Sequence, residues 1–274
     1  MRYFLVLLFL TVYCSCKKDQ IDYSQRINLL QNNFSPKIAG TSVTVMTYNL
    51  QCGFPIGHDP WNINDTGGSI EHIDSLAQFI NSTGADIIAL QEVPLGRSNN
   101  KVKAFLDSLA KCLGMNYAYT SHGYNDAYNP DFPLTGQWGV AILTRYGIES
   151  MDSREVSYES IWTRRSTIRA RLRLDASREI DVFSLHHEPR QDASDLMKSA
   201  EFVHESTLPS IVCGDFNTGV SYPTQYLQMQ ESLPDSIRGI DMIFHGPSFQ
   251  VLEAHTAYQV DLSDHPPYWA KLSF

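Results

Sequence analysis

Short apolar segments rich in β-branched residues alternate with segments of helical periodicity along most of the 274-residue chain. Residues 41–50 and 86–93 are typical of strands, and between them Ile70, Ile73 and Ile80 recur at helical spacing. Further strands are expected near 116–121, 138–145, 165–174, 180–186, 210–215, 240–244, 249–255 and 268–273, and further helices near 102–114 and 191–206. Hairpins mixed with helical crossovers predict an α/β fold in which packed sheets are covered by helices.

The N-terminus has the pattern of an export signal. Arg2 precedes an apolar run over residues 3–12, which is too short to span a bilayer and ends at Cys16. We interpret residues 1–16 as a signal peptide with a lipobox-like Cys16, which would leave a lipoprotein anchored in the cell envelope. The alternative is ordinary secretion with a free N-terminus. The polar residues 17–40 are interpreted as a tether.

Residues 41–274 show no internal repeat and no second linker, so we expect one domain. We also expect a monomer. Twenty-one Lys and Arg against thirty Asp and Glu give a formal charge of −9, which provides no general field for holding a polyanion. Five scattered cysteines without a CxxC pair argue against both a disulfide scaffold and a zinc site.

Polar side chains gather at the boundaries of the expected strands, and most of them follow a strand, whereas Asp241 lies inside one and Asp264 and His265 precede the last. They are Asn49, Gln51, Glu92, His186, His187, Asp215, Asn217, Asp241, Asp264 and His265. Strand ends converge at one edge of a sheet, which is the usual place for an α/β active site. Carboxylate and amide oxygens suit Mg²⁺, Mn²⁺ or Ca²⁺ better than zinc, and histidines beside carboxylates suit acid–base chemistry.

Seven motifs resemble, in the same order, those of the endonuclease/exonuclease/phosphatase superfamily, especially its deoxyribonuclease I-like members. They are TYNLQ, LQEV, GVAILTR, SLHHEP, GDFN, GIDMIF and SDHPP, and the resemblance covers about residues 41–274. It implies a four-layer α/β sandwich of two packed mixed β-sheets flanked by helices. It also implies divalent-metal-dependent hydrolysis of phosphate esters, with Mg²⁺ expected and Mn²⁺ or Ca²⁺ possible.

The resemblance assigns metal binding mainly to Glu92, with Asn49 contributing its side-chain carbonyl and Asp264 completing the set. Gln51 either assists or serves only the turn at the strand end. A carboxylate at the end of a buried strand is costly without a cation or another partner.

The resemblance also assigns catalytic roles. Asp215 orients or deprotonates the attacking water, and Asn217 donates to a phosphoryl oxygen. Asp241 pairs with His265, and together they activate the water. His186 contacts the phosphate or protonates the leaving oxygen, although no acidic partner for it is evident.

Several positions stay open at this stage. Arg165 matches a phosphate-binding arginine of relatives, with Arg164 and Arg169 as rivals. One tyrosine among Tyr117, Tyr119, Tyr124 and Tyr128 is expected to bind phosphate, and His187 is expected to be structural.

For the substrate, the sequence slightly favours small-molecule or lipid phosphate esters, either diesters or monoesters, at the envelope. The stretch between Asn217 and Asp241 is short and has no basic or aromatic-rich insertion for holding a duplex. The alternatives are a secreted or lipid-anchored nuclease that acts on nucleic acid, and a catalytically inactive binding module.

Overall fold

The computed structural model describes residues 26–58, 70–94, 105–124, 138–157, 164–189, 193–234, 236–237 and 239–274. The predicted signal peptide and Tyr128 lie outside these ranges. Among the described residues, no helix is long and apolar enough to cross a membrane.

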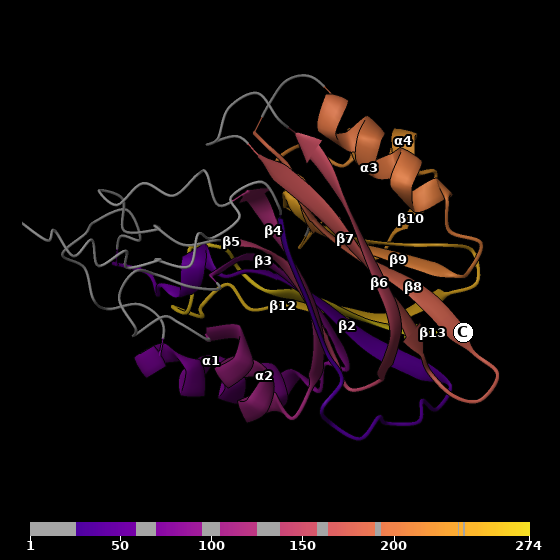
Figure 1. Cartoon of the computed structure of the whole chain (residues 1–274). Helices are drawn as coiled ribbons and strands as arrows, with labels where there is room; N and C mark the ends of the chain where they lie inside the picture. Colours follow the sequence, from indigo (N-terminus) through magenta and orange to yellow (C-terminus); the bar gives the residue numbers. More distant parts are fainter. Residues whose placement is uncertain are drawn as a thin grey trace, which may run out of the picture.

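Two mixed β-sheets pack face to face (Figure 1). The first has the order β1 (Arg26–Gln31), β4 (Asn116–Tyr124), β5 (Trp138–Thr144), β3 (Ile87–Pro94), β2 (Ser42–Asn49), β13 (Tyr268–Ser273) and β12 (Gln250–Thr256). The second has the order β10 (Gln230–Glu231), β11 (Asp241–His245), β9 (Ser210–Asp215), β8 (Glu179–His186), β7 (Arg165–Arg173) and β6 (Gly147–Ser157). In each sheet one pair is parallel, β2 with β3 and β8 with β9.

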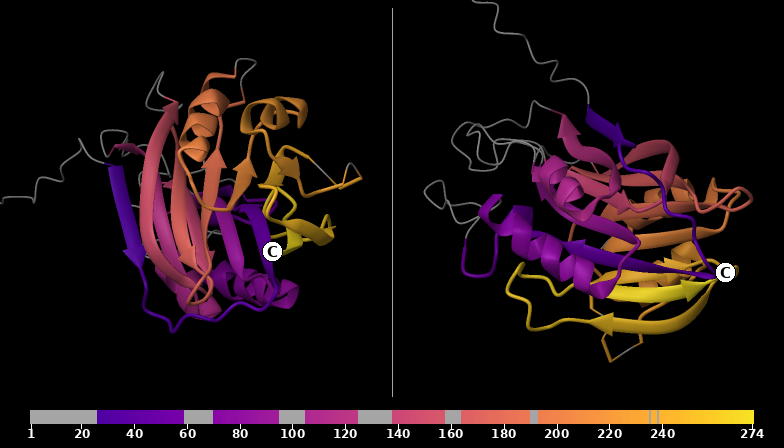
Figure 2. Two further views of the ribbon diagram at one scale, coloured as in Figure 1. Left: turned by 90° about the vertical axis from the view of Figure 1, so that its right-hand side faces the viewer. Right: turned by 90° about the horizontal axis from the view of Figure 1, so that it is seen from below.

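Helices cover the outer faces of both sheets. Helices α1 (Ile70–Thr83) and α2 (Phe105–Leu113) lie on the first sheet, and α3 (Ser194–His204) and α4 (Ser221–Leu227) lie on the second (Figures 1 and 2). A single-turn 3₁₀ helix, η1 (Gln51–Gly53), follows β2. The predicted four-layer α/β sandwich is therefore confirmed.

The strand periodicity explains how one strand serves two layers. In β2, Val43 and Val45 face the core between the sheets, whereas Met46 and Tyr48 face α1 and α2. Because successive side chains point to opposite faces, a strand buried on both sides is apolar at nearly every position.

Part of the predicted tether belongs to the folded domain. Residues 26–31 form β1, an edge strand paired antiparallel with β4. Within it, Leu29 and Leu30 lie opposite Tyr119 and Ala118. The polar composition of this segment concealed a strand, because an edge strand needs fewer apolar side chains than a central one. Strand β6 and helix α4 were also missed, and α3 is shorter than the predicted helix.

Gly214 shows how tightly the second sheet is built beside the strand ends. A Cβ atom at this position would lie 2.2 Å from the carbonyl oxygen of Leu185 in the neighbouring strand β8. At Gly246, after β11, the nearest atom to such a Cβ would be 3.7 Å away, which is an ordinary contact.

Gly214→Ala is therefore expected to destabilise the protein by roughly 3 kcal/mol, lowering the Tm by about 6–12 °C, because the strands must separate. Gly246→Ala is the matched control and is expected to change the Tm by less than about 2 °C. Thermal unfolding followed by circular dichroism measures both variants. Equal melting temperatures for the two variants would contradict the packing argument.

Candidate active site

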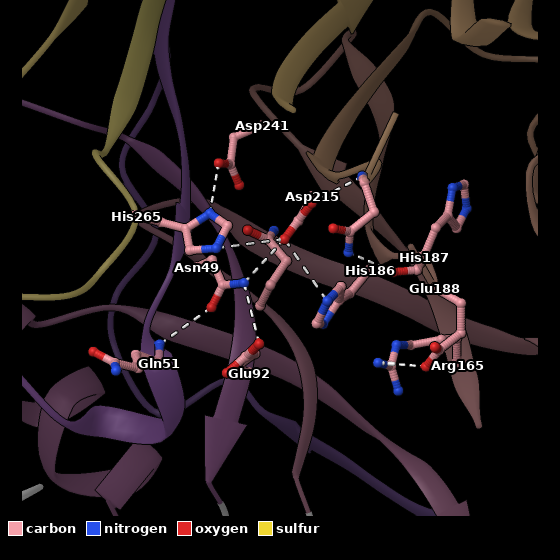
Figure 3. A network of polar contacts seen from close by, with 12 residues as sticks. Asn49, Gln51, Glu92, Arg165, His186, His187, Glu188, Asp215, Asp241 and His265 are labelled. Atoms are coloured by element: carbon pink, nitrogen blue, oxygen red, sulfur yellow. Dashed lines mark hydrogen bonds and ion pairs between the residues drawn. The ribbon is translucent and has the colours of Figure 1, made fainter. Parts of the chain in front are cut away.

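The polar strand ends identified in the sequence meet at one edge of the sandwich (Figure 3). In the second sheet, Asp215 at the end of β9 lies opposite both His186 of β8 and Asp241 of β11. In the first sheet, Asn49 closes β2 beside Gln91 of β3. The two sheets thus bring side chains separated by more than 150 residues into contact.

Asn49 bridges the two sheets. Its Nδ2 donates to Asp215 Oδ2 over 3.1 Å and lies 3.4 Å from Glu92 Oε1, while its Oδ1 accepts from the backbone N–H of Gln51 over 3.1 Å. The carbonyl that we expected to face a metal is therefore turned toward the η1 backbone. The carboxylates of Asp215 and Glu92 face the N–H₂ group of the Asn49 amide instead.

Glu92 occupies a strained backbone position at the end of β3. Its φ of 51° lies in the left-handed region that non-glycine residues seldom adopt. Burial raises the pKa of the Glu92 carboxyl, and the charge of Asp264 raises it further. The thiol of Cys52 lies 3.5 Å from Glu92 Oε2, a contact that the sequence did not reveal.

His265 and Asp241 form the predicted pair. His265 Nδ1 lies 2.8 Å from Asp241 Oδ2, and its Nε2 lies 3.9 Å from Asp215 Oδ2. Burial works against protonation of His265, but the hydrogen bond to Asp241 and the nearby carboxylate charges raise its pKa to about 9. Burial and the charge of Asp241 raise the pKa of Asp215 to about 7.

His186 is buried close to a carboxylate that the sequence did not reveal as its partner, because its Nε2 lies 3.7 Å from Asp215 Oδ2. The imidazole is 3% exposed and is enclosed by the rings of Trp138 and His122, at centroid distances of 5.9 and 5.6 Å. Burial, followed by the charge of Arg165, lowers its pKa well below 6.5. This shift favours the neutral ring, and both expected roles of His186, contact with the phosphate and protonation of the leaving oxygen, stay predictions. A neutral ring can still donate a hydrogen bond.

Asn217 and His187 support the loop after β9. Asn217 has a φ of 49°, its backbone N–H donates to Asp215 Oδ1 over 2.9 Å, and its Nδ2 donates to the His187 carbonyl over 2.7 Å. The His187 ring is buried, with Nε2 2.8 Å from Ser199 Oγ, and burial lowers its pKa to about 3. These contacts agree with the structural role expected for His187. Phosphate donation by Asn217 stays a prediction.

Among the three arginine candidates, Arg165 lies at the site. Its guanidinium is buried beside Glu188 and His186, and the charges of Glu92 and Asp215 act on it (Figure 3). Arg169 instead pairs with Asp152 at 3.2 Å and lies over the Phe202 ring.

The structure describes the side chains of two of the four tyrosines that were candidates for binding phosphate. The hydroxyl of Tyr117 donates to Asp107 of α2, on the outer side of the first sheet. Tyr119 is fully buried, which raises the pKa of its hydroxyl above the normal range. The side chain of Tyr124 and all of Tyr128 lie outside the described part of the structure.

The residues at this edge fit a divalent cation. Oxygen or nitrogen atoms of Asp215, Asp241 and His265 all lie within 4.8 Å of one another. Asp241 Oδ1 is buried and has no hydrogen-bond partner among the described residues. Burial raises the pKa of Asp241, as it does that of Glu92, so each ionised carboxylate lacks sufficient compensation. A cation bound at this edge would supply it.

Buried carboxylates beside an Asp–His pair, at the edge of a two-sheet sandwich, are typical of a hydrolytic active site. The model of the Endonuclease/Exonuclease/phosphatase family matches residues 46–265, and the chain belongs to this family, whose name covers enzymes that hydrolyse phosphate esters. No match is found among curated proteins.

Solved structures with a similar fold come from several sources. An endonuclease/exonuclease/phosphatase from Beutenbergia cavernae has a TM-score of 0.66 and 17% identity, over 86% of this chain and 72% of that one. A mannosyl-6-phosphatase from Bacteroides thetaiotaomicron has a TM-score of 0.59 and 18% identity, over 85% of this chain and 100% of that one. The human Nocturnin catalytic domain with bound sulfate has a TM-score of 0.61 and 16% identity, over 93% of this chain and 99% of that one. At these identities the likeness shows the fold.

Proposed function

We propose that the protein is a divalent-metal-dependent phosphodiesterase or phosphatase acting on small-molecule or lipid phosphates. The observation that carries the proposal is the meeting of Glu92, Asp215 and the His265–Asp241 pair at one point between the two sheets. The mannosyl-6-phosphatase and the sulfate bound to Nocturnin support a site for tetrahedral anions. A lipid anchor at Cys16 would place this activity at the cell envelope.

The full set of acidic, amide and imidazole side chains supports an enzyme over an inactive binding module. A divalent cation held by Glu92, with Asn49 and Asp264 beside it, would polarise the phosphoryl oxygens and offset the charge that develops on them. Asp215 accepts the proton of the attacking water, because its pKa of about 7 lies near the working pH.

The two histidines then stabilise the phosphoryl group in different ways. His265 is held by Asp241 and has a pKa of about 9 in the cation-free protein, and in its protonated form it donates to a phosphoryl oxygen. The water activation expected of the His265–Asp241 pair is thereby assigned to Asp215. His186, which is neutral, donates a single hydrogen bond. The Arg165 guanidinium lies on the same side, where the charges of Glu92 and Asp215 act on it.

The proposal is tested by assaying residues 17–274 on a generic phosphodiester, a generic phosphomonoester and plasmid DNA, each with Mg²⁺ or EDTA. We expect hydrolysis of a small ester that EDTA abolishes and Mg²⁺ restores, with the plasmid left intact. Nicking of the plasmid at a comparable rate would favour the nuclease instead. Activity that survives EDTA would overturn the metal dependence, and no activity on any substrate would favour the inactive module.

A further inference from the structure

Arg165 is neutralised by a carboxylate that the proposed mechanism does not use. Its Nη2 lies 2.5 Å from Oε1 of Glu188, and the two side chains are only 8% and 11% exposed. Glu188 follows β8 by two residues, in the motif HHEP, so the strand that carries His186 also delivers this carboxylate. Figure 3 shows the pair beside His186.

Further contacts hold the Arg165 guanidinium in place. Its Nη1 donates to the backbone carbonyl of Arg164 over 2.9 Å, and its central carbon lies 5.1 Å from the centroid of the Trp138 ring. Its Nε is buried and has no hydrogen-bond partner within the described ranges. Arg165 thus keeps one unused donor and a position that does not depend on Glu188 alone.

The backbone that carries Glu188 is also held in place. Its backbone N–H donates to Asp195 Oδ2 over 3.2 Å, at the start of α3. A buried carboxylate this close to a guanidinium cancels most of its charge at short range. Arg165 therefore keeps its position and its hydrogen-bond donors in the site, but most of its positive charge is cancelled by Glu188.

This cancellation matters because the site is already strongly acidic. Glu92, Asp215 and Asp241 converge there, and the charge of Asp264 acts on both Glu92 and Asp241. A phosphomonoester carries almost two negative charges at pH 8, whereas a phosphodiester carries one. Beyond the proposed cation and His265, Arg165 is the cationic group placed to compensate the second charge of a monoester, and Glu188 cancels much of its charge.

We propose that Glu188 is a specificity-determining residue that favours monoanionic phosphodiesters over dianionic phosphomonoesters by neutralising Arg165. This inference rests on the proposed function, since it assumes that the site hydrolyses phosphate esters. It narrows the substrate class to diesters.

The test compares bis(4-nitrophenyl) phosphate with 4-nitrophenyl phosphate, which share a leaving group, at pH 8 with Mg²⁺. Glu188→Gln keeps the shape of the side chain and removes its charge, so the ratio of monoester to diester kcat/KM is expected to rise about tenfold or more. Glu188→Asp keeps the charge and is expected to leave the ratio within about threefold of the wild-type ratio.

The matched control is Glu205→Gln. Glu205 also pairs with an arginine, Arg154, at 2.9 Å, but on the exposed surface after α3. We expect no change in the ratio for this variant. An unchanged ratio in Glu188→Gln, or the same change in Glu205→Gln, would overturn the inference while leaving the proposed function intact.

A binding measurement keeps the inference testable if Glu188→Gln does not fold. Calorimetry on the wild-type protein with Mg²⁺ at pH 8 compares dimethyl phosphate, a monoanion, with inorganic phosphate, mainly a dianion. We expect dimethyl phosphate to bind at least as tightly, and clearly tighter binding of inorganic phosphate would overturn the inference. Wild-type protein that hydrolyses neither ester would instead count against the proposed function, and the calorimetry would then decide the inference separately.

Discussion

Glu92→Gln is expected to lower kcat/KM for phosphate-ester hydrolysis by about a thousandfold or more, while making the cation-free protein more stable. The activity is lost because the neutral glutamine amide cannot balance the charge of a divalent cation as the Glu92 carboxylate does. Stability is gained because burial raises the pKa of Glu92, so the folded state holds its proton more tightly than the unfolded state does. The stability of the cation-free wild-type protein therefore falls as pH rises above the unfolded pKa.

The gain from Glu92→Gln should accordingly be larger at pH 8 than at pH 4. Thermal unfolding in EDTA at the two pH values measures it, and we expect a rise in Tm of about 4 °C or more at pH 8. Glu253→Gln is the matched control, because Glu253 is an exposed glutamate on β12 that pairs with Lys271. Activity within tenfold of wild type in Glu92→Gln would contradict its assignment to the metal.

Asp241→Asn is expected to reduce kcat/KM by about three to four orders of magnitude, by analogy with the loss of the orienting carboxylate in other Asp–His pairs. The Asp241 carboxylate holds His265 Nδ1 at 2.8 Å and is a main cause of its raised pKa. Without that charge and its hydrogen bond, burial is opposed only by the charges of Asp215 and Asp264, and the His265 pKa should fall clearly below about 9. Less imidazolium would then be present at neutral pH.

The imidazole resonances of His265, followed by NMR in EDTA as the pH is raised, measure this change directly. Because the folded pKa is raised, the stability that His265 contributes in the wild-type protein is complete below about pH 6.5 and is lost as pH rises through about 9. Asp152→Asn, at an exposed pair with Arg169, should alter neither the resonances nor the activity. A His265 pKa that stays near 9 in Asp241→Asn would show that Asp241 does not control it.

The local sequence determined the layers and most of the site. Alternating apolar strands and amphipathic helices predicted the two-sheet sandwich, because burying both faces of a strand requires a recognisable pattern. Polar residues at strand ends marked Glu92, Asp215 and His265, because strand ends share a sheet edge. The pairing of His265 with Asp241 came from the family resemblance, and the 2.8 Å contact agrees with it.

Only the tertiary structure decided which side chains neutralise or enclose one another. The sequence offered no sign that the rings of Trp138 and His122 enclose His186. It also offered no sign that Glu188 pairs with Arg165. The partners in each contact come from separate segments of the chain, so neither contact leaves a local sequence pattern. Residues 26–31 likewise look like a tether until β4 provides an edge for them to pair with. Local pattern specifies which surface each element buries, whereas the charge and protonation of a site depend on distances set by the assembled sheets.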